Sequence, residues 1–218
     1  MGRVLSEHRA PVSSLDFTND GELLLSAGED ERICVYSCQS GTLNRVVQCP
    51  QHGVSIARFT HDPLTVLCAS RRTAGRPATA SFAPAADEHA LRYHSLHDNT
   101  YLRFFRGHTA DVHGLELSPK EDCFASIAAD NTLRTWDLRS PNCSGMMQFD
   151  SAGYQSSLSY DPEGLVLAVA ACGSMVKLFD VRYYSKGPFV TWTPVGNQPK
   201  NFSCISFSRD GKMMLLGT

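Results

Sequence analysis

The sequence predicts an all-β fold of repeated four-stranded sheets, arranged as the blades of a propeller. Three observations predict it. A set of positions recurs at an offset of 100 residues, short apolar runs alternate with turn residues, and no segment of 11 or more residues shows convincing helical periodicity. The offset carries the most weight, because a fixed internal period is the signature of a repeat architecture.

The size and charge of the chain limit the classes of function. A chain of 218 residues, 42% of them hydrophobic, can bury about 70% of the surface that it exposes when unfolded. We therefore expect a single domain over residues 1–218. Lys and Arg total 20 against 22 Asp and Glu, and the net charge of −2 is too weak to hold bulk nucleic acid or an anionic membrane. The segment Met1–Val12 lacks the apolar core of a signal peptide. These features favour a soluble, intracellular protein that contacts nucleic acid only indirectly.

The clearest repeat relates two copies at identical internal spacing. The first holds His8, Val12, Leu15, Ser26, Asp30 and Tyr36, and the second holds His108, Val112, Leu115, Ser126, Asp130 and Trp136. In the first copy we expect strands at 14–17, 23–26 and 33–36, because these short apolar runs are separated by turn residues.

A third copy lies between these two. His52 precedes Ser70 by 18 residues and Asp87 precedes Tyr93 by six, the same intervals as in the other copies. The interval from Ser70 to Asp87 is 17 residues where the others use four, which indicates an insertion at about 71–86 between the second and third strands. Without the excess of 13 residues, the offset of 100 becomes two units of about 43, the length of a four-stranded WD-type blade.

Weaker copies follow in phase. At the four polar positions the fourth copy has Ser151, Val169, Gly173 and Phe179, so nearly the whole polar set is absent together. A fifth copy contains the turn Asp210-Gly211, and the sequence ends at Thr218 before that copy is complete. We therefore expect an incomplete propeller of about four and a half blades of a seven-bladed ring.

The second of the two clear copies carries the dipeptides Gly107-His108 and Trp136-Asp137, and the units resemble WD repeats. In WD repeats a His before the first strand, a Ser or Thr on the second, an Asp in the next turn and a Trp on the third form a hydrogen-bonded set. The resemblance implies three structural sets, which are His8–Ser26–Asp30–Tyr36, His52–Ser70–Asp87–Tyr93 and His108–Ser126–Asp130–Trp136.

A His, a Ser and an Asp are also the members of a hydrolase triad. The combination occurs three times here, however, and the chain has no G-x-S-x-G nucleophile motif. We therefore expect these residues to be scaffolding, and we expect no catalytic residue.

Metal and cofactor sites are not predicted. His94 and His97 are an odd number of residues apart, so on a strand they point to opposite faces, and His89 does not complete a site with them. The eight cysteines include no C-x-x-C pair, which is typical of buried free thiols in a reducing compartment.

The insertion is the candidate partner-binding segment. It contains Arg71, Arg72 and Arg76, and in propellers the connections between second and third strands lie on the usual docking face. Guanidinium groups there can bind a phosphopeptide through bidentate contacts. The alternative is a mobile loop without a function.

Several longer stretches extend the resemblance beyond a generic WD repeat: Leu91–Tyr101, Trp136–Cys143, and Met175–Arg182 with Lys186–Phe189. They are similar to the WD-repeat protein 82 family over about Val4 to Thr218. The resemblance implies a nuclear, chromatin-associated adaptor without enzymatic activity, which belongs to a COMPASS-type histone lysine methyltransferase complex. It also implies that the adaptor links this complex to transcribing RNA polymerase II through the polymerase's phosphorylated C-terminal repeat.

The sequence leaves four other interpretations open. The same resemblance implies relatives in a protein phosphatase 1 complex with its targeting subunit, and in mRNA 3′-end processing and transcription termination. A truncated product without an independent function is another reading, because the repeats stop before a ring could close. An enzyme on a propeller frame would need convergent polar groups around a central pocket.

Overall fold

The structure, a computed structural model, describes residues 4–70, 87–149, 156–171, 175–193 and 202–217. Its elements are β-strands and the short 3-10 helix η3 (Tyr184–Lys186), which confirms the all-β prediction. The chain forms two compact units, unit 1 from residue 1 to 107 and unit 2 from residue 108 to 218.

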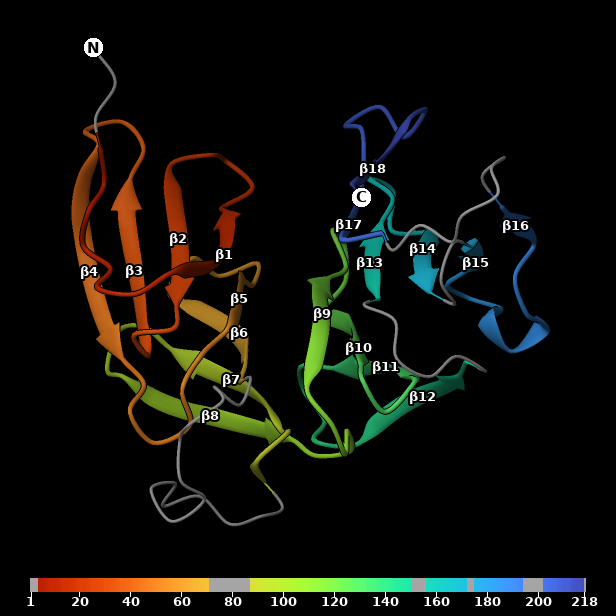
Figure 1. The fold of residues 1–218 in the computed structure, drawn as a ribbon, viewed down its shortest axis with the longest axis horizontal. Helices are drawn as coiled ribbons and strands as arrows, with labels where there is room; N and C mark the ends of the chain where they lie inside the picture. The colour runs from red at the N-terminus through yellow and green to blue at the C-terminus, as the bar shows by residue number, and fades with distance from the viewer. Residues whose placement is uncertain (1–3, 71–86, 150–155, 172–174, 194–201, 218) are drawn as a thin grey trace. The chain divides into compact units, whose positions relative to one another are not determined.

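Unit 1 contains two antiparallel four-stranded sheets whose strands follow chain order (Figure 1). Sheet 1 consists of β1 (Val12–Phe17), β2 (Leu23–Gly28), β3 (Arg32–Ser37) and β4 (Thr42–Gln48). Sheet 2 consists of β5 (Ile56–Phe59), β6 (Thr65–Ala69), β7 (Leu91–Ser95) and β8 (Thr100–Phe105). The insertion expected at 71–86 falls between β6 and β7 and lies outside the described residues.

Unit 2 contains two more sheets of the same kind and a shorter one. Sheet 3 consists of β9 (Val112–Leu117), β10 (Cys123–Ala128), β11 (Thr132–Asp137) and β12 (Cys143–Gln148). Sheet 4 consists of β13 (Ser157–Tyr160), β14 (Val166–Ala171), β15 (Met175–Asp180) and β16 (Val190–Trp192). Sheet 5 consists of β17 (Cys204–Phe207) and β18 (Met214–Gly217).

Side-chain hydrogen bonds shape the turns between first and second strands. In sheet 1, Asp20 Oδ1 accepts hydrogen bonds from Thr18 Oγ1 (2.6 Å) and from the N–H of Glu22 (2.9 Å), and Gly21 adopts a φ of 73°. Ser208, Asp210 and Gly211 repeat this arrangement in sheet 5. Glycine adopts a positive φ without steric cost, so the Asp-Gly pair suits this turn.

The cores lie between neighbouring sheets. In unit 1, Leu25 and Ile33 of sheet 1 pack in one cluster with Ala57 and Val66 of sheet 2. In unit 2, one cluster joins sheets 3 and 4, and another joins sheets 4 and 5. Full burial of a Leu, Ile or Val side chain stabilises the folded state by about 1.5–3 kcal/mol. Stacking of the sheets therefore adds stability that a single sheet, with its apolar faces open to water, would lack.

Hydrogen bonds also join the first strands of neighbouring sheets, and they follow the sequence period. Asp16 on β1 accepts the N–H of Phe59 on β5 (2.8 Å), 43 residues away. Glu116 on β9 accepts a hydrogen bond from the hydroxyl of Ser159 on β13 (3.3 Å), also 43 residues away. Burial raises the pKa of Asp16, despite the opposing effects of Arg58 and of the N–H groups of Phe59 and Phe17.

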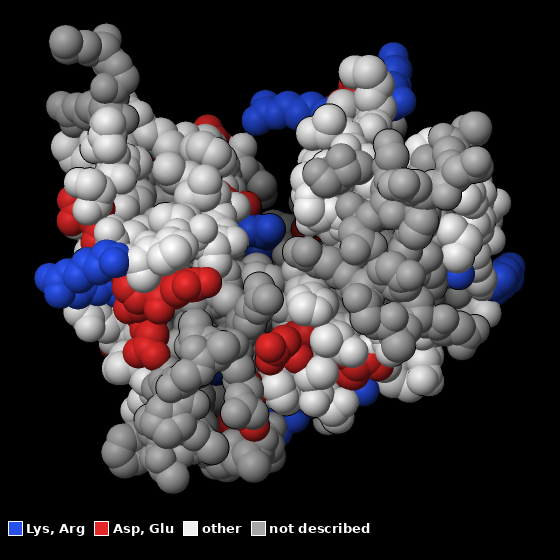
Figure 2. Space-filling view, viewed as in Figure 1, with Lys and Arg blue, Asp and Glu red and all other residues white. Residues whose placement is uncertain are grey.

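Charged side chains are dispersed over the visible face of the molecule. Figure 2 shows small groups of basic and acidic side chains separated by uncharged surface, in keeping with the net charge of −2. In the described part of the chain no helix is long and apolar enough to cross a membrane.

Candidate functional site

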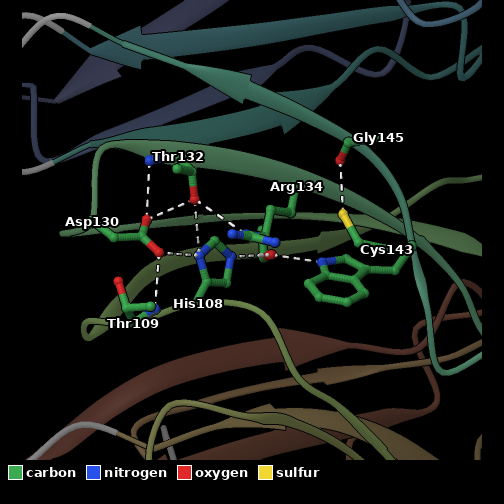
Figure 3. A network of polar contacts seen from close by, with 9 residues as sticks. His108, Thr109, Asp130, Thr132, Arg134, Cys143 and Gly145 are labelled. Carbon is green, nitrogen blue, oxygen red and sulfur yellow. Dashed lines mark hydrogen bonds and ion pairs between the residues drawn. The ribbon is translucent and has the colours of Figure 1, made fainter.

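The polar set of sheet 3 is brought together as a continuous chain of hydrogen bonds (Figure 3). The ring of His108, just before β9, contacts the Ser126 hydroxyl on β10 through Nε2 (2.7 Å) and the Asp130 carboxylate through Nδ1 (3.0 Å). The indole Nε1–H of Trp136 on β11 donates to the same hydroxyl (2.9 Å). The set thus ties the approach to the first strand to the second and third strands.

The contacts allow one consistent pattern of donors and acceptors. If His108 carries its proton on Nδ1, it donates to Asp130, and its Nε2 accepts the hydroxyl proton of Ser126. The oxygen of Ser126 then accepts the Trp136 N–H. Ser126 is 0% exposed, so its oxygen is enclosed by these partners and is out of reach of a substrate.

Thr132 is a member of this set that sequence reasoning missed. Its hydroxyl donates to Asp130 Oδ1 (2.7 Å), lies 3.2 Å from His108 Nδ1 and accepts a hydrogen bond from Arg134 Nε (3.3 Å). The signal was present, because a Thr two residues after an Asp commonly hydrogen-bonds it in a turn.

The environment of Asp130 favours its charged form. Burial acts to raise the pKa of Asp130, but hydrogen bonds from His108, from Thr132 and from the N–H of Thr109 outweigh it and hold the pKa well below its usual range. Such charge-assisted bonds to a buried carboxylate are stronger than neutral ones.

Sheet 1 repeats the arrangement with a phenol in place of the indole. His8 Nδ1 lies 2.8 Å from Asp30 Oδ1, and its Nε2 lies 2.7 Å from the Ser26 hydroxyl. The N–H of Arg9 donates to Asp30 Oδ2 (2.9 Å), and Tyr36 forms a side-chain hydrogen bond with Ser26. Burial raises the pKa of Tyr36 to about 12. The pKa of Asp30 is lowered, because its hydrogen bonds and its contacts with His8 and Arg32 outweigh the effect of burial.

The set predicted for sheet 2 is corrected by the strand register. In sheets 1, 2 and 3 the register in which the third strand pairs with the fourth has one irregularity. It falls directly before Tyr36 in sheet 1 and directly before Trp136 in sheet 3. In sheet 2 it falls directly before His94. His94 therefore occupies the position of Trp136, and the predicted Tyr93 is one residue off.

The second strand of sheet 2 is shifted as well. Trp136 pairs with Phe124, two residues before Ser126, whereas His94 pairs with Val66, two residues before Cys68. Cys68 therefore occupies the position of Ser126, and the predicted Ser70 is two residues off. Neither count crosses the insertion at 71–86, so the physical reason is that backbone pairing and the burial of strand faces set the register, which residue spacing alone does not fix.

The other predicted members of this set make different contacts. The Ser70 hydroxyl donates to the carbonyl oxygen of Glu88 (3.1 Å), and Asp87 forms an ion pair with Arg106. The ring of His52 packs edge-on against the rings of Tyr101 and Phe104, with distances between ring centres of 5.2 Å and 5.6 Å.

The other residues singled out in the sequence are either buried in the apolar core or lie outside the described residues. In sheet 4, Val169 (0% exposed) and Phe179 (4%) lie in the apolar cluster shared with sheet 3, whereas Ser151 and Gly173 lie outside the described residues. Arg71, Arg72 and Arg76 also lie outside them. Among the described residues, no group of three or more His, Cys, Asp or Glu side chains could hold a metal ion.

Together, the four-stranded sheets and the His–Ser–Asp sets define a WD-repeat protein of the β-propeller class. The family model of the WD domain, G-beta repeat, matches residues 2–37 and 99–137.

Comparison with curated proteins gives more specific similarities. The chain is 38% identical over its full length to "WD repeat-containing protein 82" of Drosophila melanogaster. It is 31% identical to "Set1 complex component swd2" of Schizosaccharomyces pombe and 26% identical to "COMPASS component SWD2" of Saccharomyces cerevisiae, each over 95% of the chain. The chain is thus similar to members of the WD-repeat protein 82 family. It spans 63%, 54% and 58% of the length of these three relatives.

Proposed function

We propose that this chain is a non-catalytic scaffold subunit of a COMPASS-type histone lysine methyltransferase complex. The observation that supports it most is the similarity, over 95% of the chain, to a Set1 complex component and a COMPASS component. It includes loops between sheets whose sequence the fold alone does not dictate. Function in repeat proteins resides in such surfaces, whereas the shared fold by itself indicates none.

The geometry of the polar sets supports a role without catalysis. A hydrolase triad needs an exposed nucleophile beside a base. In sheet 3 the Ser126 hydroxyl is buried and hydrogen-bonded by both His108 and Trp136. The arrangement therefore serves to hold strands together, and the chemical step of a complex would belong to another subunit.

The proposal also covers the cellular location of the protein and its partners. As a subunit of such a complex it acts in the nucleus on chromatin, and it links the methyltransferase to RNA polymerase II through the phosphorylated C-terminal repeat. Arg71, Arg72 and Arg76 are the candidate contacts for the phosphate groups, because guanidinium groups bind phosphate bidentately.

Binding measurements with the complete 218-residue chain test the proposal. The immobilised chain is offered an N-terminal segment of the methyltransferase, and polymerase repeat peptides with and without phosphate. We expect binding of the methyltransferase segment and of the phosphorylated peptide alone. Changing the three arginines of the insertion to Glu should abolish peptide binding and leave methyltransferase binding intact.

Arg139→Glu is the matched control. Arg139 is exposed and paired with Asp137 in its own turn, and its replacement should leave both interactions unchanged. If a cooperatively folded chain bound neither ligand, the proposed function would be wrong. Binding of a protein phosphatase 1 targeting segment instead would favour the phosphatase alternative.

A further inference from the structure

The connection between β15 and β16 is longer than the matching connections of the other sheets and contains the 3-10 helix η3. It spans residues 181–189, whereas the connection between the third and fourth strands spans 38–41 in sheet 1, 96–99 in sheet 2 and 138–142 in sheet 3. A connection that is long and ordered is more often functional than a short turn that only joins two strands. We call residues 181–189 the β15–β16 loop.

Backbone and side-chain contacts hold the β15–β16 loop in place. The N–H of Lys186 donates to the carbonyl oxygen of Tyr183 (2.9 Å), which closes the turn of η3. The hydroxyl of Tyr184 donates to the carbonyl oxygen of Ser144 on β12 (3.5 Å), and the absence of a side chain at Gly145 leaves room for the Tyr184 ring. The loop therefore presents its exposed side chains from a fixed backbone, which lowers the entropy cost of binding a partner.

Two aromatic side chains of the β15–β16 loop are open to water. Tyr183 is 54% exposed and Phe189 is 58% exposed. Strand β16, which follows Phe189 directly, is exposed along its whole length. Aromatic residues are enriched at protein interfaces, because they offer a large contact area at a small loss of conformational freedom. Several exposed apolar side chains in one segment indicate an interaction site, whereas a single one does not.

Two cations lie beside the exposed ring of Tyr183. Lys186 Nζ lies 4.4 Å from the centre of this ring, and Arg182 Cζ lies 5.8 Å from it. Cations are attracted to the face of an aromatic ring by its electrostatic field. An acidic segment that packs on the Tyr183 ring would therefore also meet positive charge.

The charge of the β15–β16 loop and its flanking strands is positive. Asp180, at the end of β15, forms two hydrogen bonds with the Arg182 guanidinium (3.1 and 3.0 Å), and among the described residues no carboxylate forms an ion pair with Lys186. Residues 175–193 include Lys177, Arg182 and Lys186 but one acid, Asp180, in a chain whose net charge is −2. A partner of complementary charge is therefore acidic.

We propose that the β15–β16 loop is a docking site for an acidic peptide segment of a partner protein. Apolar side chains of the segment contact the rings of Tyr183 and Phe189, and an Asp or Glu carboxylate of the segment pairs with Lys186. Nucleic acid fits this chain less well, because its net charge of −2 repels a polyanion at long range. The proposal goes beyond the proposed function and does not depend on it, since it involves none of the candidate contacts named there.

Fluorescence anisotropy with the complete chain tests the docking site. The probe is a short fluorescent peptide in which Glu alternates with Phe, and its counterpart has Gln in place of every Glu. We expect the wild type to bind the Glu peptide, and the affinity to fall as salt is added, because salt screens exposed charges. The Gln peptide should bind at least about tenfold more weakly.

Substitutions locate the binding on the loop. Lys186→Glu and Tyr183→Ala should each weaken binding of the Glu peptide by about tenfold or more, since truncation of a central aromatic or reversal of a paired charge has effects of this size. Tyr183→Phe keeps the ring and should bind like the wild type. The matched controls are Lys212→Glu, on an exposed turn of sheet 5, and Leu102→Ala, whose side chain on β8 is 50% exposed. Both should also bind like the wild type.

Thermal unfolding of each variant shows whether a loss of binding reflects a loss of folding, and we expect no change, because the altered side chains are exposed. Equal affinities for the two peptides, no binding of the Glu peptide by the wild type, or an equal loss in Lys212→Glu would overturn the proposal. Tighter binding of a fluorescent oligouridine, lost in Tyr183→Ala, would overturn it in favour of single-stranded nucleic acid. Self-association in sedimentation that Phe189→Ala abolishes would overturn it in favour of a second copy of the chain.

Discussion

The indole N–H of Trp136 donates to the hydroxyl of Ser126 at 2.9 Å, and both side chains are 0% exposed. The same hydroxyl contacts His108, whose other ring nitrogen contacts Asp130. Four residues, from two strands, a turn and the segment before β9, are thus linked in one chain of hydrogen bonds. This linkage gives the following expectations for stability.

Asp130→Ala should lower the free energy of unfolding by about 1–3 kcal/mol. The substitution leaves His108 Nδ1, the N–H of Thr109 and the Thr132 hydroxyl without their common acceptor, and buried unsatisfied groups cost about that much. Urea unfolding of the purified chain measures the change. Asp137→Ala is the control, because its ion pair with Arg139 is exposed and such pairs contribute only about 0–1 kcal/mol. Equal losses in both variants would contradict the hydrogen-bonded set.

Acid should destabilise the protein in part through Asp130 and Asp30, whose native pKa values are lowered. A carboxyl with a lowered native pKa stabilises the fold fully above its unfolded pKa, here the ordinary value of 3.8. That stability disappears as the pH falls through the native pKa. Urea unfolding between pH 7 and pH 3 should therefore show a steeper loss below about pH 4–5 in the wild type than in Asp130→Ala. Parallel pH profiles would argue against the lowered pKa.

Ser126→Ala should cost more than Ser70→Ala, which tests the corrected register. Loss of the Ser126 hydroxyl leaves both His108 Nε2 and Trp136 Nε1 buried without a partner, a cost of about 2 kcal/mol or more. Ser70 donates a single bond, to the carbonyl oxygen of Glu88, and its removal should cost about 1 kcal/mol. Thermal unfolding of the two variants side by side measures the difference. If Ser70→Ala proved as damaging as Ser126→Ala, Ser70 would belong to a set of the predicted kind.

Arg92→Met should not lower the free energy of unfolding, because Arg92 on β7 is 0% exposed and its Nε and Nη1 atoms have no hydrogen-bond partner among the described residues. Replacing a buried charged group with an apolar side chain of similar volume is often neutral or stabilising by about 1–4 kcal/mol. Denaturant unfolding in a zwitterionic buffer measures the effect, with Arg134→Met as the partly exposed comparison. A clear loss of stability would mean that the guanidinium already has compensating partners within the fold.

Much of the fold could be predicted because the repeat is local in sequence. The sets of sheets 1 and 3 have identical spacing, since the turn between their second and third strands has the same length, and counting from His8 or His108 reaches the correct partners. The apolar replacements Val169 and Phe179 were visible for the same reason. The middle set could not be counted in this way, because the insertion separates Cys68 from His94 and the pairing with Val66 is a matter of contacts in space.

By itself the sequence determined the period, the four-stranded units and the members of two polar sets, because short turns transmit spacing directly into strand register. Only the tertiary structure decided that Cys68 and His94 stand where Ser126 and Trp136 stand. It alone placed Thr132 in the set of sheet 3 and buried Arg92 on β7. The physical reason is that register across a long loop is set by backbone pairing and by the burial of opposing faces, neither of which is encoded in residue spacing.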